Sequence, residues 1–246
     1  MPLIEDQETR VILLDIEGTT TPVDFVYRTL FGYARENLAT FLHRSSNEPE
    51  VRTCVDRLKA QHAIDRQSAQ NPPEWPTGQM SELDSAARYG LWLMEHDSKI
   101  GPLKALQGLI WQEGYHSGML QGEVFADVPR AFDRWRRQGK EISIYSSGSI
   151  LAQEMLFRTT RFGDLTAGIK SFFDTRVGNK TSTESYKKIA VDSGYPENQF
   201  LFFSDTVGEL DAARSAGMQT ALVVRSSKAD VESVGHIAIK SFDEVG

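Results

Sequence analysis

The stretch VILLDIEGTT, residues 11–20, decides the fold of this chain. Its first four residues, Val11–Leu14, form an unbroken apolar run, whereas a strand with one face in water would alternate apolar and polar residues. We therefore predict a strand that is buried on both faces of a parallel sheet. Asp15 ends the apolar run, so we expect functional residues where this strand ends.

Apolar runs that stop at polar residues recur along the chain. Segments with helical periodicity separate them, and this alternation indicates an α/β protein with a doubly wound parallel sheet. Ligands of such sheets bind beyond the carboxyl ends of the strands, where Asp15, Ser146 and Asp205 are expected to meet. The other predicted strands are Glu141–Tyr145, Phe200–Phe203, Ala221–Val224 and a short one at His236–Ile239, and the predicted helices are Pro129–Arg137, Ile150–Arg158, Glu184–Asp192 and Val207–Ser215.

Residues 25–121 break this alternation, because they contain no convincing strand. We interpret them as a helical cap domain inserted after the first strand, so that residues 1–24 and 122–246 form the catalytic core. A cap in this position would keep water from the site, and the alternative is an insertion that only adds stability or an interface. Its expected helices are Phe25–Leu42, Glu50–Ala69, Ser81–Glu95 and Pro102–Tyr115, with a loop at Gln70–Gln79.

The composition excludes several classes of protein. A formal net charge of -7 over 246 residues argues against a general nucleic-acid binder, which needs clustered Lys and Arg. Cys54 is the single cysteine, which excludes an internal disulfide and fits a reducing compartment. The first residues lack the pattern of a signal peptide, and no apolar run could span a bilayer. We expect a cytoplasmic protein without nucleic-acid or membrane partners.

Asp15 and Glu17 are two acids separated by one residue at the end of the predicted buried strand. A carboxylate can attack phosphorus to form an aspartyl phosphate. A second acid two positions later can protonate the leaving oxygen and then activate water. Gly18 allows a tight turn after them. The competing interpretation is a turn that carries two helix-capping acids.

Two other strand ends carry groups that complement these acids. Ser146–Gly148 precedes a predicted helix, whose first amides and a serine hydroxyl can bind an anion, although serine is common at any helix start. Asp205 follows another predicted strand, and Glu209 comes four residues later. Oxygen ligands of this kind suit Mg²⁺, so Asp205 is the expected metal ligand and Glu209 its supporting acid.

Carboxylates cannot face a phosphate dianion without compensating positive charge, which a metal ion and a lysine can supply. Lys180, in the polar stretch Gly178–Lys180, is the predicted lysine, and Lys187 is the reserve candidate. Asp211 is interpreted as a solvated helix residue. The five histidines show no metal-ligand spacing.

Four stretches of this chain resemble the haloacid dehalogenase superfamily. Most phosphatases of that superfamily carry Asp-x-Asp in the first of these stretches, whereas glutamate stands second here, at Glu17, as in the enolase-phosphatase family. The resemblance covers both halves of the predicted core. The stretches are VILLDIEGTTTPVDFVY at residues 11–27, FADVPRAFDRWRRQGKEISIYSSGS at 125–149, FDTRVGNKTSTESYKKIA at 173–190 and FLFFSDTVGELDAA at 200–213.

The resemblance implies a role for each matched residue. Asp15 is the expected nucleophile and Glu17 the expected acid and base, and both help to hold Mg²⁺. Ser146 and Ser147 bind the phosphoryl group, Lys180 pairs with it, and Asp205 completes the metal site. Asn179 stands here where the family has a histidine, so the role of that histidine does not carry over.

The resemblance also implies the reaction: enolisation of 2,3-diketo-5-methylthiopentyl-1-phosphate and removal of its phosphate, by a monomeric enzyme of methionine salvage. Enolisation needs a base, for which Glu17 is the candidate, and an electrophile for the developing oxyanion. A phosphatase that acts on another small phosphate ester is one alternative. A signalling receiver module also places acids and a lysine at strand ends, but it needs no long helical insertion.

Overall fold

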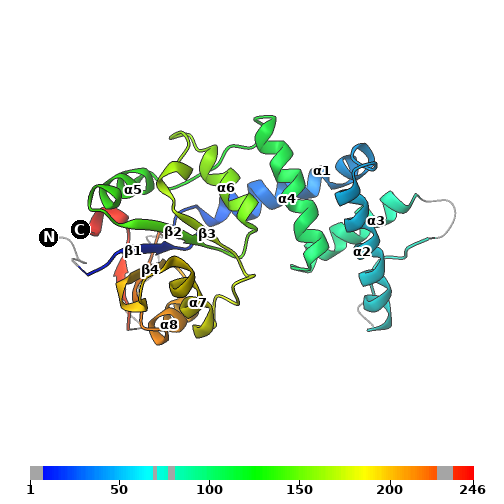
Figure 1. Ribbon diagram of the computed structural model, residues 1–246. Coiled ribbons are helices and arrows are strands. Elements are labelled where there is room, and N and C mark those ends of the chain that lie inside the picture. Colours follow the sequence, from blue (N-terminus) through cyan, green and yellow to red (C-terminus); the bar gives the residue numbers. More distant parts are fainter. Residues whose placement is uncertain (1–7, 69–70, 77–80, 226–234) are drawn as a thin grey trace. The chain divides into compact units, whose positions relative to one another are not determined.

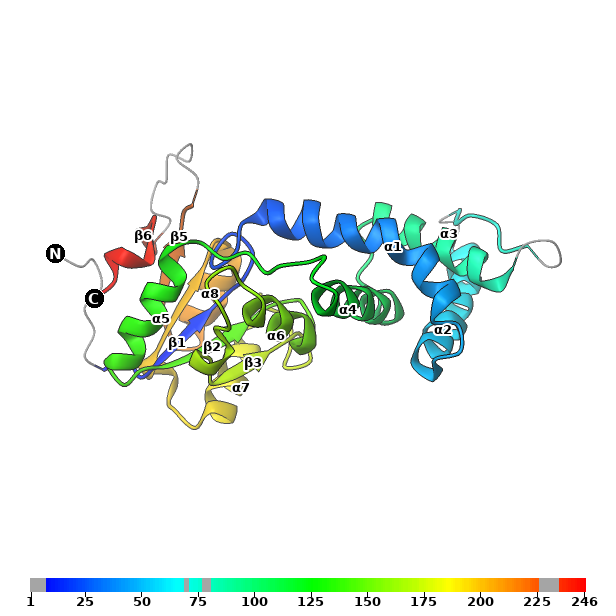
Figure 2. The same cartoon turned by 90° about the horizontal axis from the view of Figure 1, so that it is seen from above.

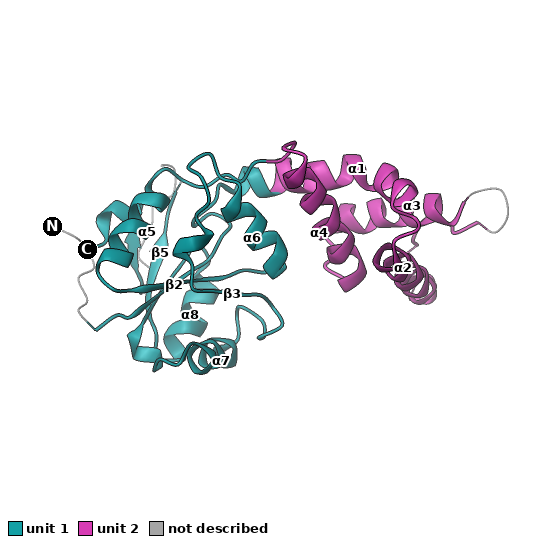
Figure 3. Ribbon diagram, turned by 45° about the horizontal axis from the view of Figure 1, so that its top comes forward, with its two compact units in different colours: residues 1–26, 121–246 teal, residues 27–120 magenta. Residues whose placement is uncertain are grey.

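The computed structural model describes residues 8–68, 71–76, 81–225 and 235–246. The chain divides into two compact units, one made of residues 1–26 and 121–246 and the other of residues 27–120 (Figure 3). The first unit is an α/β structure and the second is helical. No described helix is both long and apolar enough to cross a membrane.

The α/β unit is built on one parallel sheet of six strands, in the order β3-β2-β1-β4-β5-β6 (Figure 1). This arrangement confirms the predicted fold class. The strands are β1 at Val11–Leu14, β2 at Glu141–Tyr145, β3 at Ser171–Phe173, β4 at Phe200–Ser204, β5 at Gln219–Val223 and β6 at Ile237–Ile239.

Strand β1 lies in the middle of the sheet, between β2 and β4. Its last residue, Leu14, pairs with Ile144 of β2 and Phe203 of β4. All four residues of β1 are fully buried, as the unbroken apolar run predicts. The residues that follow β1, β2 and β4 therefore emerge side by side at one edge of the sheet.

Helices cover both faces of the sheet, with α5 and α6 on one face and α7 and α8 on the other (Figure 1 and Figure 2). Helix α5 begins two residues before the predicted start at Pro129, because proline is tolerated in the first helical turn, where backbone amides have no intrahelical acceptor. The bounds of these helices are α5 Asp127–Arg137, α6 Ile150–Arg158, α7 Thr183–Ser193 and α8 Val207–Ser215, and short helical turns lie at Thr166–Gly168, Glu197–Gln199 and Phe242–Glu244.

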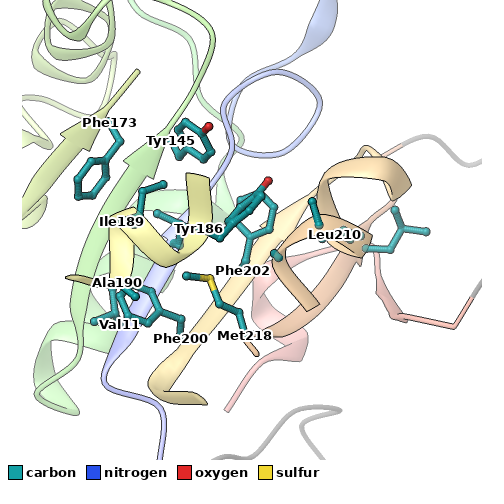
Figure 4. Packing of buried hydrophobic residues seen from close by; sticks show 14 residues of the cluster. Val11, Tyr145, Phe173, Tyr186, Ile189, Ala190, Phe200, Phe202, Leu210 and Met218 are labelled. Atoms are coloured by element: carbon teal, nitrogen blue, oxygen red, sulfur yellow. The ribbon is translucent and has the colours of Figure 1, made fainter. Parts of the chain in front are cut away.

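The two faces of the sheet have separate aromatic cores. On the face of α7 and α8, Phe200 and Phe202 of β4 pack with Tyr186 of α7 (Figure 4). On the other face, Phe203 stacks on Trp135 of α5 with ring centroids 5.9 Å apart. Neighbouring residues of β4 thus point to opposite cores, which fixes the register of the strand that carries Asp205 at its end.

The helical unit is formed by four helices. Helix α1 contacts α3 and α4, and α2 contacts the same two helices. Helices α1 and α3 approach closely at Gly90, where a Cβ would lie 2.8 Å from Cδ2 of Leu38 in α1. The helices are α1 Phe31–Arg44, α2 Pro49–Gln67, α3 Glu82–Glu95 and α4 Gly101–His116, and a π-helical turn at Phe25–Leu30 precedes them.

Three points of the sequence prediction need correction. Strand β3 was not predicted, and β5 begins two residues earlier than Ala221. The predicted helix at Phe25–Leu42 consists of the π-helical turn and α1, which continues to Arg44. Of the predicted loop at Gln70–Gln79, residues 71–76 contain no helix or strand, and the remainder lies outside the described residues.

Candidate active site at the carboxyl edge of the sheet

Asp15 opens the turn that follows β1. Its backbone N–H donates to the carbonyl of Phe203 at 3.0 Å, which extends the pairing with β4 by one residue. The carbonyl of Ile16 then accepts from the amides of Thr19 and Thr20, so the chain turns back at once. Asp15 is only 4% exposed. A buried carboxylate requires partners, and the structure provides them.

Lys180 is the main partner of Asp15. Its Nζ lies 2.5 Å from Asp15 Oδ1 and 2.7 Å from Glu209 Oε2. The other oxygen, Asp15 Oδ2, accepts from the Thr19 hydroxyl at 3.3 Å. Lys180 is 8% exposed, so this charged cluster is largely shielded from water. The predicted nucleophile and the predicted lysine, far apart in the sequence, are thus in direct contact.

The loop before α7 delivers Lys180 to this position. Tyr186 donates its hydroxyl to the Lys180 carbonyl at 2.7 Å, and Tyr145 donates to the carbonyl of Gly178 at 3.0 Å. Asn179 is exposed, and its side-chain oxygen accepts from the amide and the hydroxyl of Thr181, both at 3.0 Å. Asn179 therefore shapes the loop around Lys180 and makes no described contact with Asp15.

Glu209 is held by the end of β4 and the start of α8. The Ser204 hydroxyl donates to Glu209 Oε2 at 2.9 Å, and the same oxygen receives Lys180. These contacts give Glu209 the role of orienting and neutralising the lysine. Its role as a supporting metal ligand stays a prediction.

Asp205 lies against the turn that follows Asp15. A Cβ on Gly18 would come within 2.0 Å of Asp205 Oδ2, and Gly18 has a φ of +70°. Glycine is therefore needed at position 18 both for the backbone conformation and for the approach of this carboxylate. The Thr206 hydroxyl donates to the other oxygen, Oδ1, at 3.0 Å.

The electrostatics of the cluster follow from burial and from the charge of Asp15. Loss of water around the carboxylate, and then the negative charge of Asp15, raise the pKa of Glu209 and also that of Asp205, although Asp205 as a whole residue is exposed, and Lys180 opposes both increases. Burial alone would lower the pKa of Lys180, but attraction to Asp15 and Glu209 outweighs it and raises that pKa above its ordinary value. Lys180 is thus charged at neutral pH, and an added cation would relieve the crowded acids.

Ser146 follows β2 and lies beside this cluster in the sheet order. Its amide donates to the Phe173 carbonyl at 3.2 Å, and its hydroxyl accepts from the Gly148 amide at 3.2 Å. The Ser149 side chain caps α6 by accepting from the Ala152 amide. The first turn of this helix therefore begins shortly after Ser146 and Ser147. The segment has the features of an anion site.

Glu17 is half-buried in the turn between Ile16 and Gly18, where it forms a backbone bridge with Thr21. It follows Asp15 by two residues in the same turn. Its predicted roles as acid, base and metal ligand stay predictions. Lys187, the reserve lysine, is partly exposed and pairs with Glu184 at 2.8 Å, so it does not take part in the cluster.

No group of three or more His, Cys, Asp or Glu side chains arranged to hold a metal ion occurs within residues 8–68, 71–76, 81–225 and 235–246. Lys180 occupies the space between Asp15 and Glu209. The carboxylates of Asp15 and Asp205 are nevertheless close enough for one charge to raise the pKa of the other. Such oxygen donors fit Mg²⁺, which commonly uses one or two carboxylates and keeps several waters.

Three buried residues of the site were missed from the sequence. Asp174 follows β3 and binds the amide and the guanidinium of Arg176 at 2.9 Å. Gln153 of α6 donates to the carbonyls of Gly148 and Phe173, which joins the anion-binding segment to β3. Thr19 donates to Asp15 as described above. Two of the three had a signal in the sequence: Asp174 is an acid directly after two phenylalanines, and Thr19 stands in the turn predicted after Asp15.

Comparisons with known proteins show the family of this chain. Residues 9–217 match the family model described as haloacid dehalogenase-like hydrolase. The enolase-phosphatase E1 of Synechococcus elongatus is 45% identical over 95% of this chain and 96% of its own length. The crystal structure of the UTR4 protein of Saccharomyces cerevisiae is 32% identical, with a TM-score of 0.75, and the match covers 96% of this chain and 99% of that one.

A more distant structure has the same fold. The YfnB protein of Bacillus subtilis, described as a HAD-hydrolase bound to magnesium, is 14% identical, with a TM-score of 0.55 and coverage of 96% of each chain. This likeness supports the fold alone.

Proposed function

The chain belongs to the haloacid dehalogenase-like hydrolases and, among them, to the enolase-phosphatase E1 family, and from this membership we propose its reaction and the role of each site residue. It is a phosphatase enzyme of methionine salvage. We propose that it enolises 2,3-diketo-5-methylthiopentyl-1-phosphate and removes the phosphate. The product is the acireductone 1,2-dihydroxy-3-keto-5-methylthiopentene.

One observation carries this proposal: the buried contact of Asp15 with Lys180, beside Asp205 and Glu209. A carboxylate nucleophile needs a cation nearby to approach a phosphate dianion. Lys180 supplies one charge in a place that is shielded from water, where its effect on phosphate oxygens is strong. Ser146 and Ser147, which come shortly before α6, are the proposed ligands of the phosphoryl oxygens.

The first phosphoryl transfer forms an aspartyl phosphate. A carboxylate oxygen of Asp15 makes the new bond to phosphorus, and the bond from phosphorus to the substrate oxygen breaks. Glu17 gives its proton to that leaving oxygen. Thr19 and Lys180 each bind one oxygen of Asp15, so the carboxylate is held in a fixed orientation for attack.

Hydrolysis restores the enzyme. Glu17, now ionised, takes a proton from a water molecule, whose oxygen attacks phosphorus. The bond from phosphorus to Asp15 breaks, inorganic phosphate leaves, and the Asp15 carboxylate is regenerated. Glu17 is also the proposed base for enolisation, where it would remove the proton next to the carbonyl group.

Mg²⁺ is the proposed cofactor, with Asp15, Glu17 and Asp205 as ligands and Glu209 in support. When bound, the ion supplies positive charge that neutralises phosphate oxygens. The close approach of Asp205 to Gly18, next to Asp15, supports this choice. We further propose that the helical unit, residues 27–120, serves as the cap domain, and that the enzyme is monomeric and cytoplasmic.

Phosphate release from the diketo phosphate, with and without Mg²⁺, tests the function. We expect Asp15→Asn to lower kcat by at least about 10³-fold, since the nucleophile is lost. Asp192→Asn, on the exposed side of α7, is the matched control and should keep parental turnover. Near-parental turnover by Asp15→Asn would refute the nucleophile assignment.

A substrate panel separates the alternatives. Similar turnover of sugar phosphates, without formation of the acireductone, would favour a phosphatase for another small ester. A long-lived aspartyl phosphate without catalytic release of phosphate would favour the receiver module.

A further inference from the structure

Arg225 follows β5, outside the residues with a proposed catalytic role, yet its guanidinium reaches the turn that carries Asp15. Nε and Nη2 both donate to the carbonyl oxygen of Thr19, at 3.0 Å and 2.8 Å. Two donors on one oxygen fix both the position and the direction of that carbonyl group. Thr19 in turn donates its hydroxyl to Asp15 Oδ2.

The guanidinium of Arg225 is itself held by an ion pair and by two aromatic rings. Nη1 forms an ion pair with Asp127 at 2.6 Å, and both side chains are mostly buried. The rings of Phe125 and Phe242 lie at 4.3 Å and 4.7 Å from the guanidinium carbon. A cation in contact with two aromatic rings and with a buried carboxylate partner has little freedom to move.

Asp127, the carboxylate partner of Arg225, is also held in place. Asp127 Oδ2 also accepts from the Phe242 amide at 2.7 Å and from the Ser241 hydroxyl at 3.0 Å. The first turn of α5 and the C-terminal helical turn therefore form a rigid base for Arg225. Thr19, which accepts from the guanidinium, is completely buried.

We propose that Arg225 is a positioning residue for the nucleophile. It holds Thr19, and Thr19 orients the carboxylate oxygen of Asp15 that Lys180 does not bind. Arg225 touches neither substrate nor the reacting atoms in this assignment. The inference rests on the proposed role of Asp15, and it adds a residue that acts through the backbone of the turn.

Removal of the guanidinium should affect the chemical step more than substrate binding. We expect Arg225→Ala to lower kcat about 10-fold to 100-fold, because a small misplacement of a nucleophile has an effect of this size. KM should change less than about threefold, since Ser146, Ser147 and Lys180 keep their positions. Free guanidinium at sub-denaturing concentration should restore part of kcat in Arg225→Ala.

Arg134→Met is the matched control. Arg134 donates to the carbonyl of Phe242 at 2.5 Å, so it also secures the C-terminal helical turn, but its described contacts do not include Thr19. This variant should lose stability and keep kcat. Arg225→Lys keeps the charge beside Asp127 with one donor group, and its kcat should lie between those of the parent and Arg225→Ala; it also serves if the alanine variant does not fold.

Hydrogen exchange provides a readout that does not depend on turnover. In the Arg225 variants, the amides of residues 18–21 should exchange faster while those of β1 keep their protection, and Arg134→Met should leave residues 18–21 unchanged. Parental kcat in both Arg225 variants, or equal exchange in the Arg225 and Arg134 variants, would overturn the inference. Because exchange is measured without substrate, failure of this inference and failure of the proposed function are distinguishable.

Discussion

Lys180 carries a full positive charge in a place that water hardly reaches, and the two acids beside it make this possible. Each acid in turn depends on the lysine, because Asp15 and Glu209 would otherwise be buried near one another without a cation. Loss of one member of this cluster should therefore lower the stability of the protein more than loss of an exposed ion pair.

Lys180→Met tests this dependence. We expect its free energy of unfolding near pH 7 to fall by about 3 kcal/mol, because two buried carboxylates lose their partner. Lys187→Met removes the exposed pair with Glu184 and should change stability by less than about 0.5 kcal/mol. Urea unfolding of both variants gives the comparison. Equal losses would show that burial of the Lys180 pair is unimportant for stability.

Comparison of Gly18→Ala with Gly139→Ala separates the effect of backbone strain from the effect of the close approach of Asp205. Gly18 and Gly139 both have positive φ, +70° and +75°, but a Cβ on Gly139 meets nothing within 4 Å. Gly139→Ala should therefore lose only about 1 kcal/mol from the left-handed backbone. Gly18→Ala should lose more and should also weaken Mg²⁺ binding, because Asp205 must move away. Calorimetric titration with Mg²⁺ checks this, and unchanged affinity in Gly18→Ala would contradict it.

Three of the predicted site residues share one property. Asp15, Ser146 and Asp205 directly follow apolar strands, and parallel strands bring such positions to one edge of the sheet. Residues that act by donating to a backbone carbonyl group have no comparable signal in the sequence. Gln153 and Arg225 hold carbonyl groups of turns whose shapes exist only in the folded chain, so no spacing in the sequence could reveal them.

Among the elements, continuous apolar runs and strongly periodic segments were predicted well, whereas strand β3 was missed. Strands β1 and β2 and helices α6 and α8 have the predicted bounds. Strand β3 has only three residues, too few for a pattern of period two to be recognised. Pro129 moved the predicted start of α5, since proline is compatible both with a helix start and with a preceding turn.

The junction of α6 with β3 sets the position of the anion-binding segment. Gln153 donates from one amide group to Gly148 at 2.8 Å and to Phe173 at 2.9 Å. We expect Gln153→Leu to raise KM for the phosphate ester about tenfold, because both carbonyl groups lose a donor and the segment shifts, with a loss of about 1–3 kcal/mol in stability. The inhibition constant of inorganic phosphate should rise in parallel. Lost stability with unchanged phosphate inhibition would contradict this role.

At the scale of the whole molecule, the crowded acids link stability to pH and to metal. The pKa of Asp205 is raised by burial and by Asp15, so the folded chain binds this proton more tightly than the unfolded chain. Stability from this group is therefore lost as the pH rises from about 4, the ordinary aspartate value, through the raised pKa. At pH values above the raised pKa, the stability lost through Asp205 no longer changes with pH.

Asp205→Asn should remove this loss. Without divalent metal, we expect its Tm to exceed that of the parent at neutral pH, and the difference should shrink as the pH falls toward 4. With Mg²⁺ the order should reverse, because only the parent keeps the predicted ligand and gains stability from binding. Asp133→Asn, exposed on α5, is the control. Differential scanning calorimetry checks this, and a Tm below the parent's in metal-free neutral buffer would contradict it.

The central place of β1 has a consequence for synthesis of the chain. Of the six strands, this one leaves the ribosome first, but its partners β2 and β4 follow the helical unit in the sequence, and β4 ends only at Ser204. At roughly 5–20 residues per second, the nascent β1 waits on the order of 10–40 s for its second neighbour. During that interval an entirely apolar segment with at least one unpaired edge is a natural client for a chaperone.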